Sequence, residues 1–147
     1  MKFSAEIKGV DSLLKKLARV PKNVDKSVFD ALAAGTLKIH GDAIKSIQAQ
    51  QSKSRKEVRY DPTRIVDVSA PGHPPNSDTG RLVKSIGFDL DSQKLAGRVG
   101  TNLKYGAWLE FGTQTMAPRP WLSPAFRRNL EEIKDQIAEA FAEGIIK

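Results

Sequence analysis

Apolar and polar residues alternate at the start of the chain and then recur at helical spacing. Residues 2–8 alternate between the two kinds, which predicts a short strand that ends before Gly9. Leucine and valine recur at helical spacing over residues 11–20, so we expect a short helix that Pro21 ends. The chain therefore opens with one strand and one helix.

Two longer segments each carry one continuous apolar stripe, which is typical of an amphipathic helix. The first begins near Asn23 or Asp25, and its stripe consists of Val24, Val28, Leu32, Ile39, Ala43 and Ile47. The second is the last element and has the stripe Leu122, Phe126, Leu130, Ile133, Ile137, Phe141 and Ile145. It opens at Ser123-Pro124, where the missing N–H of proline costs nothing. Gly35 and Gly41 interrupt the first helix and either permit a close helix crossing or mark a bend.

The middle of the chain, about residues 50–78, lacks a clear period. It is polar at first and then rich in proline and glycine. A connection of this length is usually functional or disordered, so we predict a mobile loop here. Within it, Arg64 to Val68 is a brief extended segment that adds a strand or the arm of a hairpin.

Order resumes near residue 78. Asp78 or Thr79 is expected to cap one helical turn. Two strands follow over residues 85–90 and 96–100, and a turn at residues 91–93 joins them into an antiparallel hairpin.

A short helix is then predicted from a cap at Asn102 to a stop at Gly112. Together these elements predict an α+β fold, in which two long helices and shorter helices pack on a small antiparallel sheet beside a long, proline-rich, basic loop. The length of 147 residues and the lack of an internal repeat predict a single domain over residues 1–147.

Composition narrows the chemistry. Lys and Arg number 24 against 17 Asp and Glu, a net charge of +7, which suits a nucleic-acid or acidic protein partner, or solubility alone. The chain has no cysteine, which excludes disulfides and thiolate metal sites and fits folding in a reducing cytoplasm. No apolar run approaches the ~20 residues of a membrane span, and the first residues show no signal core, so we expect no membrane partner.

Five basic residues of the long loop form a candidate assembly interface: Lys53, Arg55, Lys56, Arg59 and Arg64. If all five contacted phosphate, affinity for nucleic acid would fall with salt with a log–log slope of about −4. Glu57, Asp61 and Asp67 interrupt this charge, so a solvated loop is the plainer interpretation and an assembly interface the next. A basic nucleic-acid-binding module is the alternative function.

No pattern indicates a catalytic, metal or cofactor site. His40 lies within a predicted helix, and His73 has no second ligand at the spacing that zinc requires. Glu110 stands in an apolar setting close in sequence to Arg119, where we expect a structural ion pair or bonds to loop amides. A helix-cap role explains Ser123. We therefore predict that the chain is not an enzyme.

Five of the ten aromatic residues gather in residues 105–126: Tyr105, Trp108, Phe111, Trp121 and Phe126. They form either a cluster of packed side chains in the core or an exposed docking patch. For most of them we expect the core.

Two motifs in this stretch resemble a known family. The first is Tyr105-Gly106 followed by Glu110-Phe111-Gly112-Thr113, with glycine where the family usually has alanine. The second is Pro120-Trp121-Leu122-Ser123-Pro124-Ala125, with tryptophan where phenylalanine is common. Residues 9–13 resemble the opening of the family, and residues 70–75 and 78–82 its middle. In this order the motifs resemble the neck or tail-completion proteins, also called minor tail or head–tail joining proteins, of long-tailed bacteriophages of the HK97 type. The signature comprises Gly80, Tyr105, Glu110, Phe111, Gly112, Thr113, Arg119, Pro120, Trp121 and Pro124.

This resemblance implies a structural virion protein without chemistry or cofactor, which completes the tail and joins it to the head. Its expected partners are the tail terminator or tail tube and the head connector. It implies a monomer in solution that forms a homo-oligomeric ring in the neck of the virion, after assembly in the host cytoplasm. Passing DNA would contact such a ring without being read. The adjacent roles of tail terminator and connector stay open alternatives.

Overall fold

The computed structural model describes residues 3–6, 22–50, 52–59 and 63–146. The elements follow in the order β1 (Phe3–Glu6), α2 (Lys22–Gln48), β2 (Arg55–Val58), β3 (Ile65–Val68), α3 (Arg81–Ser85), β4 (Ile86–Asp91), β5 (Ala96–Thr101), α4 (Lys104–Phe111) and α5 (Ser123–Ile146). This arrangement confirms the predicted α+β class. The helix predicted over residues 11–20 lies outside the described residues.

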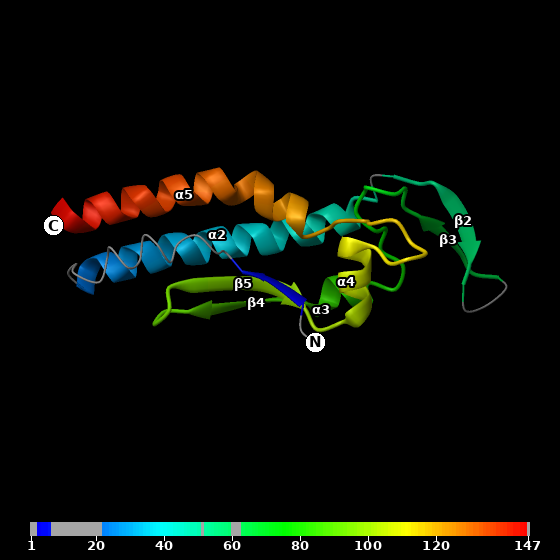
Figure 1. Ribbon diagram of the computed structural model, residues 1–147, viewed down its shortest axis with the longest axis horizontal. Coiled ribbons are helices and arrows are strands. Elements are labelled where there is room, and N and C mark those ends of the chain that lie inside the picture. Colours follow the sequence, from blue (N-terminus) through cyan, green and yellow to red (C-terminus); the bar gives the residue numbers. More distant parts are fainter. Residues whose placement is uncertain (1–2, 7–21, 51, 60–62, 147) are drawn as a thin grey trace.

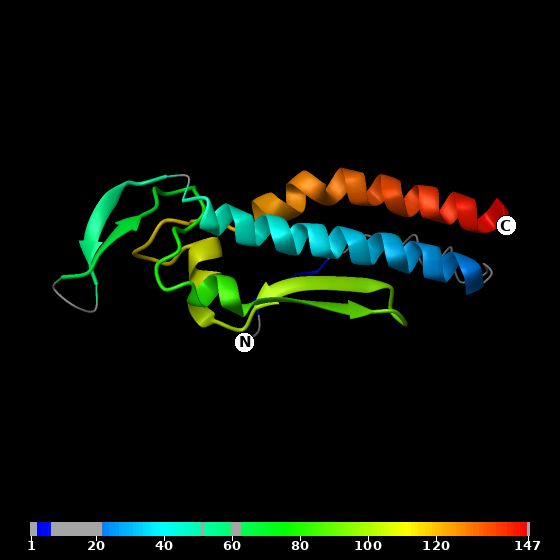
Figure 2. The same ribbon diagram turned by 180° about the vertical axis from the view of Figure 1, so that it is seen from behind.

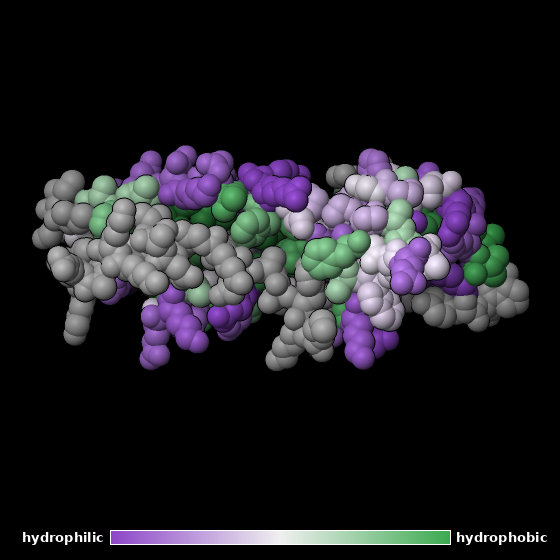
Figure 3. Space-filling model, viewed as in Figure 1, coloured by the Kyte–Doolittle hydropathy of each residue, from purple (hydrophilic) through white to green (hydrophobic). Residues whose placement is uncertain are grey.

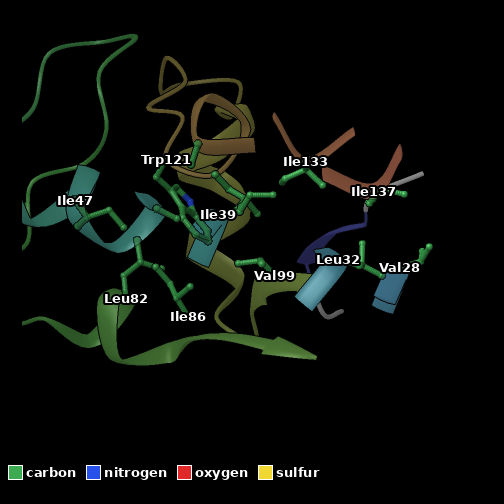
Figure 4. Close-up of a cluster of buried hydrophobic side chains, with 13 residues drawn as sticks. Val28, Leu32, Ile39, Ile47, Leu82, Ile86, Val99, Trp121, Ile133 and Ile137 are labelled. Atoms are coloured by element: carbon green, nitrogen blue, oxygen red, sulfur yellow. The ribbon is translucent and has the colours of Figure 1, made fainter. Parts of the chain in front are cut away.

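The long helix α2 lies between α5 and a three-stranded sheet. Figure 1 and Figure 2 show the same three layers from opposite sides, with the shorter helices α3 and α4 at one end of the sheet. The buried cluster that joins the layers is drawn in Figure 4. Its members are Val28, Leu32, Ile39, Ala43, Ile47, Leu82, Ile86, Val99, Trp121, Leu122, Ala125, Ile133 and Ile137. Both predicted apolar stripes contribute to this core, as their spacing requires.

The three-stranded sheet has the strand order β1-β5-β4, and both pairings are antiparallel. Thr101 of β5 lies opposite Phe3 on one side and Ile86 on the other. The predicted first strand and the hairpin of β4 and β5 are therefore confirmed. In their turn, Asp91 Oδ1 accepts hydrogen bonds of 3.0 Å from the amides of Gln93 and Lys94.

A second sheet corrects the prediction of a long basic loop. Residues 55–58 form β2, which pairs antiparallel with β3 in the register Arg55↔Val68 to Val58↔Ile65. The extended segment ending at Val68 was predicted, whereas its partner strand was missed. The reason is that β2 has no buried face, so its sequence does not alternate. Figure 1 shows this hairpin at the end of the molecule opposite the C-terminus. The mobility of residues 50–78 stays a prediction.

The two interrupting glycines of α2 behave differently. A Cβ built at Gly35 would lie 2.6 Å from Ile133 Cγ1, so this glycine permits the close crossing of α2 and α5. At Gly41 nothing lies within 4 Å of such an atom. Of the two predicted positions, only Gly35 therefore shapes the helix contact.

The residues directly before α3 and α4 differ from the predicted caps, although Thr79 still bonds the first amide of α3. Gly80, in the left-handed conformation at φ 71°, precedes α3, and Thr79 Oγ1 accepts from the amide of Arg81 at 3.3 Å. Leu103, not Asn102, precedes α4, and its amide donates to Thr101 Oγ1 at 3.1 Å. The side-chain oxygen that bonds the backbone just before α4 therefore belongs to Thr101 rather than to the predicted Asn102. The stop at Gly112 is confirmed, with φ 77°.

Candidate functional site

Glu110 joins α4 to the start of α5. Its side chain is buried, and Oε2 accepts from the amides of Trp121 at 2.8 Å and Leu122 at 2.9 Å. Oε1 accepts from the amide of Ser123 at 2.9 Å. A carboxylate at a helix N-terminus satisfies amides that have no partner within the helix and complements the helix dipole. Of the two predicted roles for Glu110, bonds to loop amides are therefore the one observed.

Trp121 anchors the same junction from the other side. Its ring is fully buried, and Nε1 donates to the carbonyl of Gly106 at 3.0 Å. Gly106 leaves no room for a side chain, because a Cβ there would lie 2.5 Å from Thr101 Cγ2. The glycine at position 106 thus accompanies a close contact with β5.

The segment between α4 and α5 is a hydrogen-bonded turn. The amide of Thr113 donates to the carbonyl of Met116 at 2.8 Å, and the hydroxyl of Thr113 accepts from the amides of Thr115 and Met116. The amide of Arg119 donates to the carbonyl of Leu109 at 2.6 Å. Pro120 follows, and Pro124 lies in the first turn of α5. These bonds fold the segment back onto α4.

Arg119 connects this turn to the base of the hairpin. Its Nε donates to the carbonyl of Ser69 at 3.1 Å. The amide of Gly72 donates to the carbonyl of Pro118 at 2.8 Å, which fastens the same two segments. The partner of Arg119 recorded here is thus a carbonyl of residue 69, at the end of β3, rather than the Glu110 carboxylate.

The five aromatic residues of this stretch divide between core and surface. Trp121 is fully buried, and Tyr105 and Phe126 pack against the core. Trp108 and Phe111 are 54% and 65% exposed. Three of the five residues therefore belong to the core, as predicted for most of them, and Trp108 and Phe111 lie at the surface.

The structure places the five basic residues of the candidate interface on or beside the β2–β3 hairpin. Most of them have an acidic partner: Arg55 and Arg59 pair with Glu57, Arg64 with Asp78, and Lys53 with Asp67. The hydrogen bond from Arg59, together with the charge of Arg55, outweighs the effect of burial and lowers the pKa of Glu57. This pairing agrees with the expectation that acidic residues interrupt the basic cluster. Its role as an assembly interface stays a prediction.

The far end of the hairpin carries an apolar pair. Val58 and Ile65 lie directly opposite each other, and each is 62% exposed. Figure 3 shows green, apolar colour at this end of the molecule beside purple, charged residues. The hairpin therefore presents both charge and apolar surface.

A pocket of about 350 Å³ lies between α4, the base of the hairpin and residues 75–82. A neighbouring hollow of about 400 Å³ shares Arg59, Val68, Met116 and Arg119 with it. Sequence reasoning missed three polar residues of the pocket, Ser69, Asn76 and Arg81. The available signal was weak: Asn76 follows Pro74-Pro75, and Ser69 continues the alternation of β3.

The two histidines lie in different surroundings. His40 Nε2 lies 3.2 Å from the carbonyl of Ile86, and the imidazole meets the ring of Phe88 edge-on. His73 is exposed. In the described part of the chain, no three His, Asp or Glu side chains gather at a distance that would hold a metal ion. None of the helices in these residues combines the length and apolarity that crossing a bilayer requires.

Comparison with known proteins gives one family. The model of the family described as "Bacteriophage HK97-gp10, putative tail-component" matches residues 11–112, more than half of the chain. No curated protein and no solved structure gives a significant match. The matched residues include α2, the hairpin, β4, β5 and α4 and end at Gly112, whereas the motif from Pro120 lies beyond them. The chain belongs to the HK97-gp10-like family of bacteriophage tail components.

Proposed function

We propose that this chain completes the tail of a long-tailed bacteriophage and joins it to the head by assembling into a ring at the neck. The family match over residues 11–112 carries the proposal, because it makes the chain a phage tail component with other virion proteins as partners. The specific partners proposed are the tail terminator or tail tube on one side and the head connector on the other. Before assembly in the host cytoplasm, the chain would be a monomer.

The shape of the molecule supports a ring. The hairpin with exposed Val58 and Ile65 lies at one end, and the exposed Trp108 and Phe111 belong to α4 in the body (Figure 1). These are different surfaces of one chain. Contacts between different surfaces are heterologous, and they generate a ring when the rotation between neighbours closes.

We further propose that the role is structural rather than catalytic. Glu110 is the carboxylate that the sequence singles out for acid–base chemistry. Both of its oxygens already accept backbone hydrogen bonds at the start of α5. A carboxylate held by three amides serves the fold and is poorly placed to exchange protons with a substrate.

The test is in vitro complementation of head–tail joining with the purified protein. Tails assembled without this protein should fail to join heads, and addition of the purified chain should restore infectious particles. A particle reconstruction should then show the chain as a closed ring between tail and connector. If the folded protein does not restore joining, the proposed role is wrong. If joining returns but the chain lies elsewhere than the neck, the ring proposal fails.

A further inference from the structure

The pocket beside α4 has one apolar side that opens to solvent. This side consists of Ile47, Leu82, Tyr105, Trp108, Leu109 and Met116. Trp108 is half exposed, so a partner can reach it. An indole beside aliphatic side chains is suited to bury an apolar side chain of a partner.

Two polar residues that line the pocket, Ser69 and Asn76, each contain a buried side-chain oxygen without a hydrogen-bond partner among the described residues. Within the described residues, no hydrogen bond is made by Ser69 Oγ or Asn76 Oδ1. Ser69 is only 2% exposed, and both residues line the pocket. Buried polar groups nearly always have a partner, so these two atoms indicate that something else supplies it. A hydroxyl donor and an amide acceptor are together the two groups that a peptide bond of a ligand needs.

The charges around the pocket favour an acidic occupant. The lining carboxylates of Asp67 and Asp78 are already paired, with Lys53 at 3.1 Å and Arg64 at 2.5 Å. For the lining residues Arg81 and Arg119, in contrast, no carboxylate partner is present in the described part of the chain. Arginine binds carboxylates through paired charge-assisted hydrogen bonds.

The same charges argue against a second copy of this chain as the occupant. The β2–β3 hairpin projects at one end of the molecule (Figure 1), and its exposed surface carries Lys53, Arg55, Lys56, Arg59 and Arg64. Like charges brought together at an interface are unfavourable. The charges therefore favour a different protein as the occupant.

We propose that this pocket binds an extended segment of another protein that combines an apolar side chain with Asp or Glu residues. The apolar side chain packs on Trp108, the backbone bonds Ser69 and Asn76, and the carboxylates meet Arg81 and Arg119. That the other protein belongs to the virion rests on the proposed function. The chemistry of the segment rests on the pocket alone.

The experiment is a selection from a random decapeptide library displayed on yeast. The full-length chain is the bait, and the Trp108→Ala variant is used for counter-selection. Recovered sequences should combine an aromatic or aliphatic residue with Asp or Glu. A recovered peptide is then labelled with fluorescein and titrated by fluorescence anisotropy.

Matched variants separate binding from folding. Trp108→Ala should lower the affinity for the labelled peptide about tenfold or more, because a buried aromatic anchor contributes much of the binding free energy of an interface. Phe111→Ala is its control, since Phe111 lies on the same helix and does not line the pocket. Ser69→Ala should weaken binding about threefold to tenfold and leave urea stability unchanged or raised, because its hydroxyl bonds nothing in the described fold. Arg81→Gln should reduce the salt dependence of binding, and Lys84→Gln should not.

Several results would overturn the proposal. Recovery of no peptide above background does so, as does enrichment of basic peptides or unchanged affinity of Ser69→Ala and Trp108→Ala. If a short DNA duplex binds with dependence on Trp108 and Arg81, the occupant is nucleic acid and the proposal fails. If the chain self-associates and Trp108→Ala abolishes that association, the occupant is a second copy. Failure of the proposed function is observed separately, as heads that do not join tails, and peptide binding does not depend on that assay.

Discussion

Replacing Glu110 tests the side chain that accepts three backbone hydrogen bonds at the α4–α5 junction. Glu110→Ala leaves three amides at the start of α5 without an acceptor, those of Trp121, Leu122 and Ser123. The first two bonds are buried, and the third is partly buried. An unsatisfied buried group costs about 1–3 kcal/mol, and water can reach the third amide. Because neighbouring effects are not additive, we expect Glu110→Ala to lower the free energy of unfolding by about 3–5 kcal/mol.

Glu110→Gln separates the geometry of the side chain from its charge. The remaining carbonyl oxygen can still accept from Trp121 and Leu122, as Oε2 does. The new amino group then faces the amide of Ser123, and two donors oppose each other. The charge that complements the helix dipole is lost as well. We expect an intermediate loss of about 1–3 kcal/mol.

Urea denaturation gives the measurement. Trp121 is fully buried and reports unfolding by fluorescence, and a Trp108→Phe background removes the signal of the exposed indole. The slope of the free energy with urea should stay constant in the series, so that shifts in midpoint report stability. Glu139→Gln, on the exposed face of α5, is the control and should stay within about 0.5 kcal/mol of the parent. A loss below about 1 kcal/mol for Glu110→Ala would refute the structural role assigned to this carboxylate.

Three further predictions concern the contact between α4 and β5, the stability of the β2–β3 hairpin, and the basic residues of that hairpin. Gly106→Ala should destabilise by about 1–3 kcal/mol because its Cβ meets Thr101 Cγ2, and Thr101→Ser in the same chain should restore much of the loss in thermal melting. Because hydrogen bonding to Arg59 holds the pKa of folded Glu57 below its reference value of 4.5, the hairpin gains stability that is present above that value and is lost as the pH falls through the folded pKa. Amide exchange of residues 55–58 measures this loss, and Glu57→Gln should remove its pH dependence. Because most of the cluster is paired with acids, duplex DNA should bind with a salt slope well short of about −4, and replacing Arg55, Lys56, Arg59 and Arg64 by Ala should change affinity little. A steep slope abolished by that replacement would instead establish the nucleic-acid-binding module.

The elements predictable from sequence are those with one buried face. Helices α2 and α5 each bury a single stripe in the core, and the period of that stripe survives in the sequence. The hairpin of β4 and β5 was found for a related reason, because Gly97 and Val99 turn inward between more exposed neighbours. The register could not be read in advance, since it depends on the turn at Asp91 and on pairing with β1.

Strand β2 and the pocket were not predictable because their determinants are contacts between distant segments. Three of the four residues of β2 are exposed, so its strand conformation comes from pairing with β3. Ser69 is polar and short, and nothing local indicates that it is buried or that Arg119 bonds its carbonyl. The sequence left two roles for Glu110, an ion pair or bonds to loop amides. Only the fold shows that α5 begins within hydrogen-bond distance of its carboxylate.

The position of Glu110 also explains why aromatic rings face outward. Gly106 and Glu110 are four residues apart on α4 and are both buried, so they share the inner face of the helix. Trp108 and Phe111 are three residues apart and occupy the outer face. An ordinary amphipathic helix would be turned the other way, because burying a large apolar side chain stabilises a fold by about 1.5–3 kcal/mol. The three amides at the start of α5 hold the carboxylate inward and so fix the aromatic face outward. A fold that leaves this much apolar surface exposed gains from covering it, and assembly with another virion protein would do so.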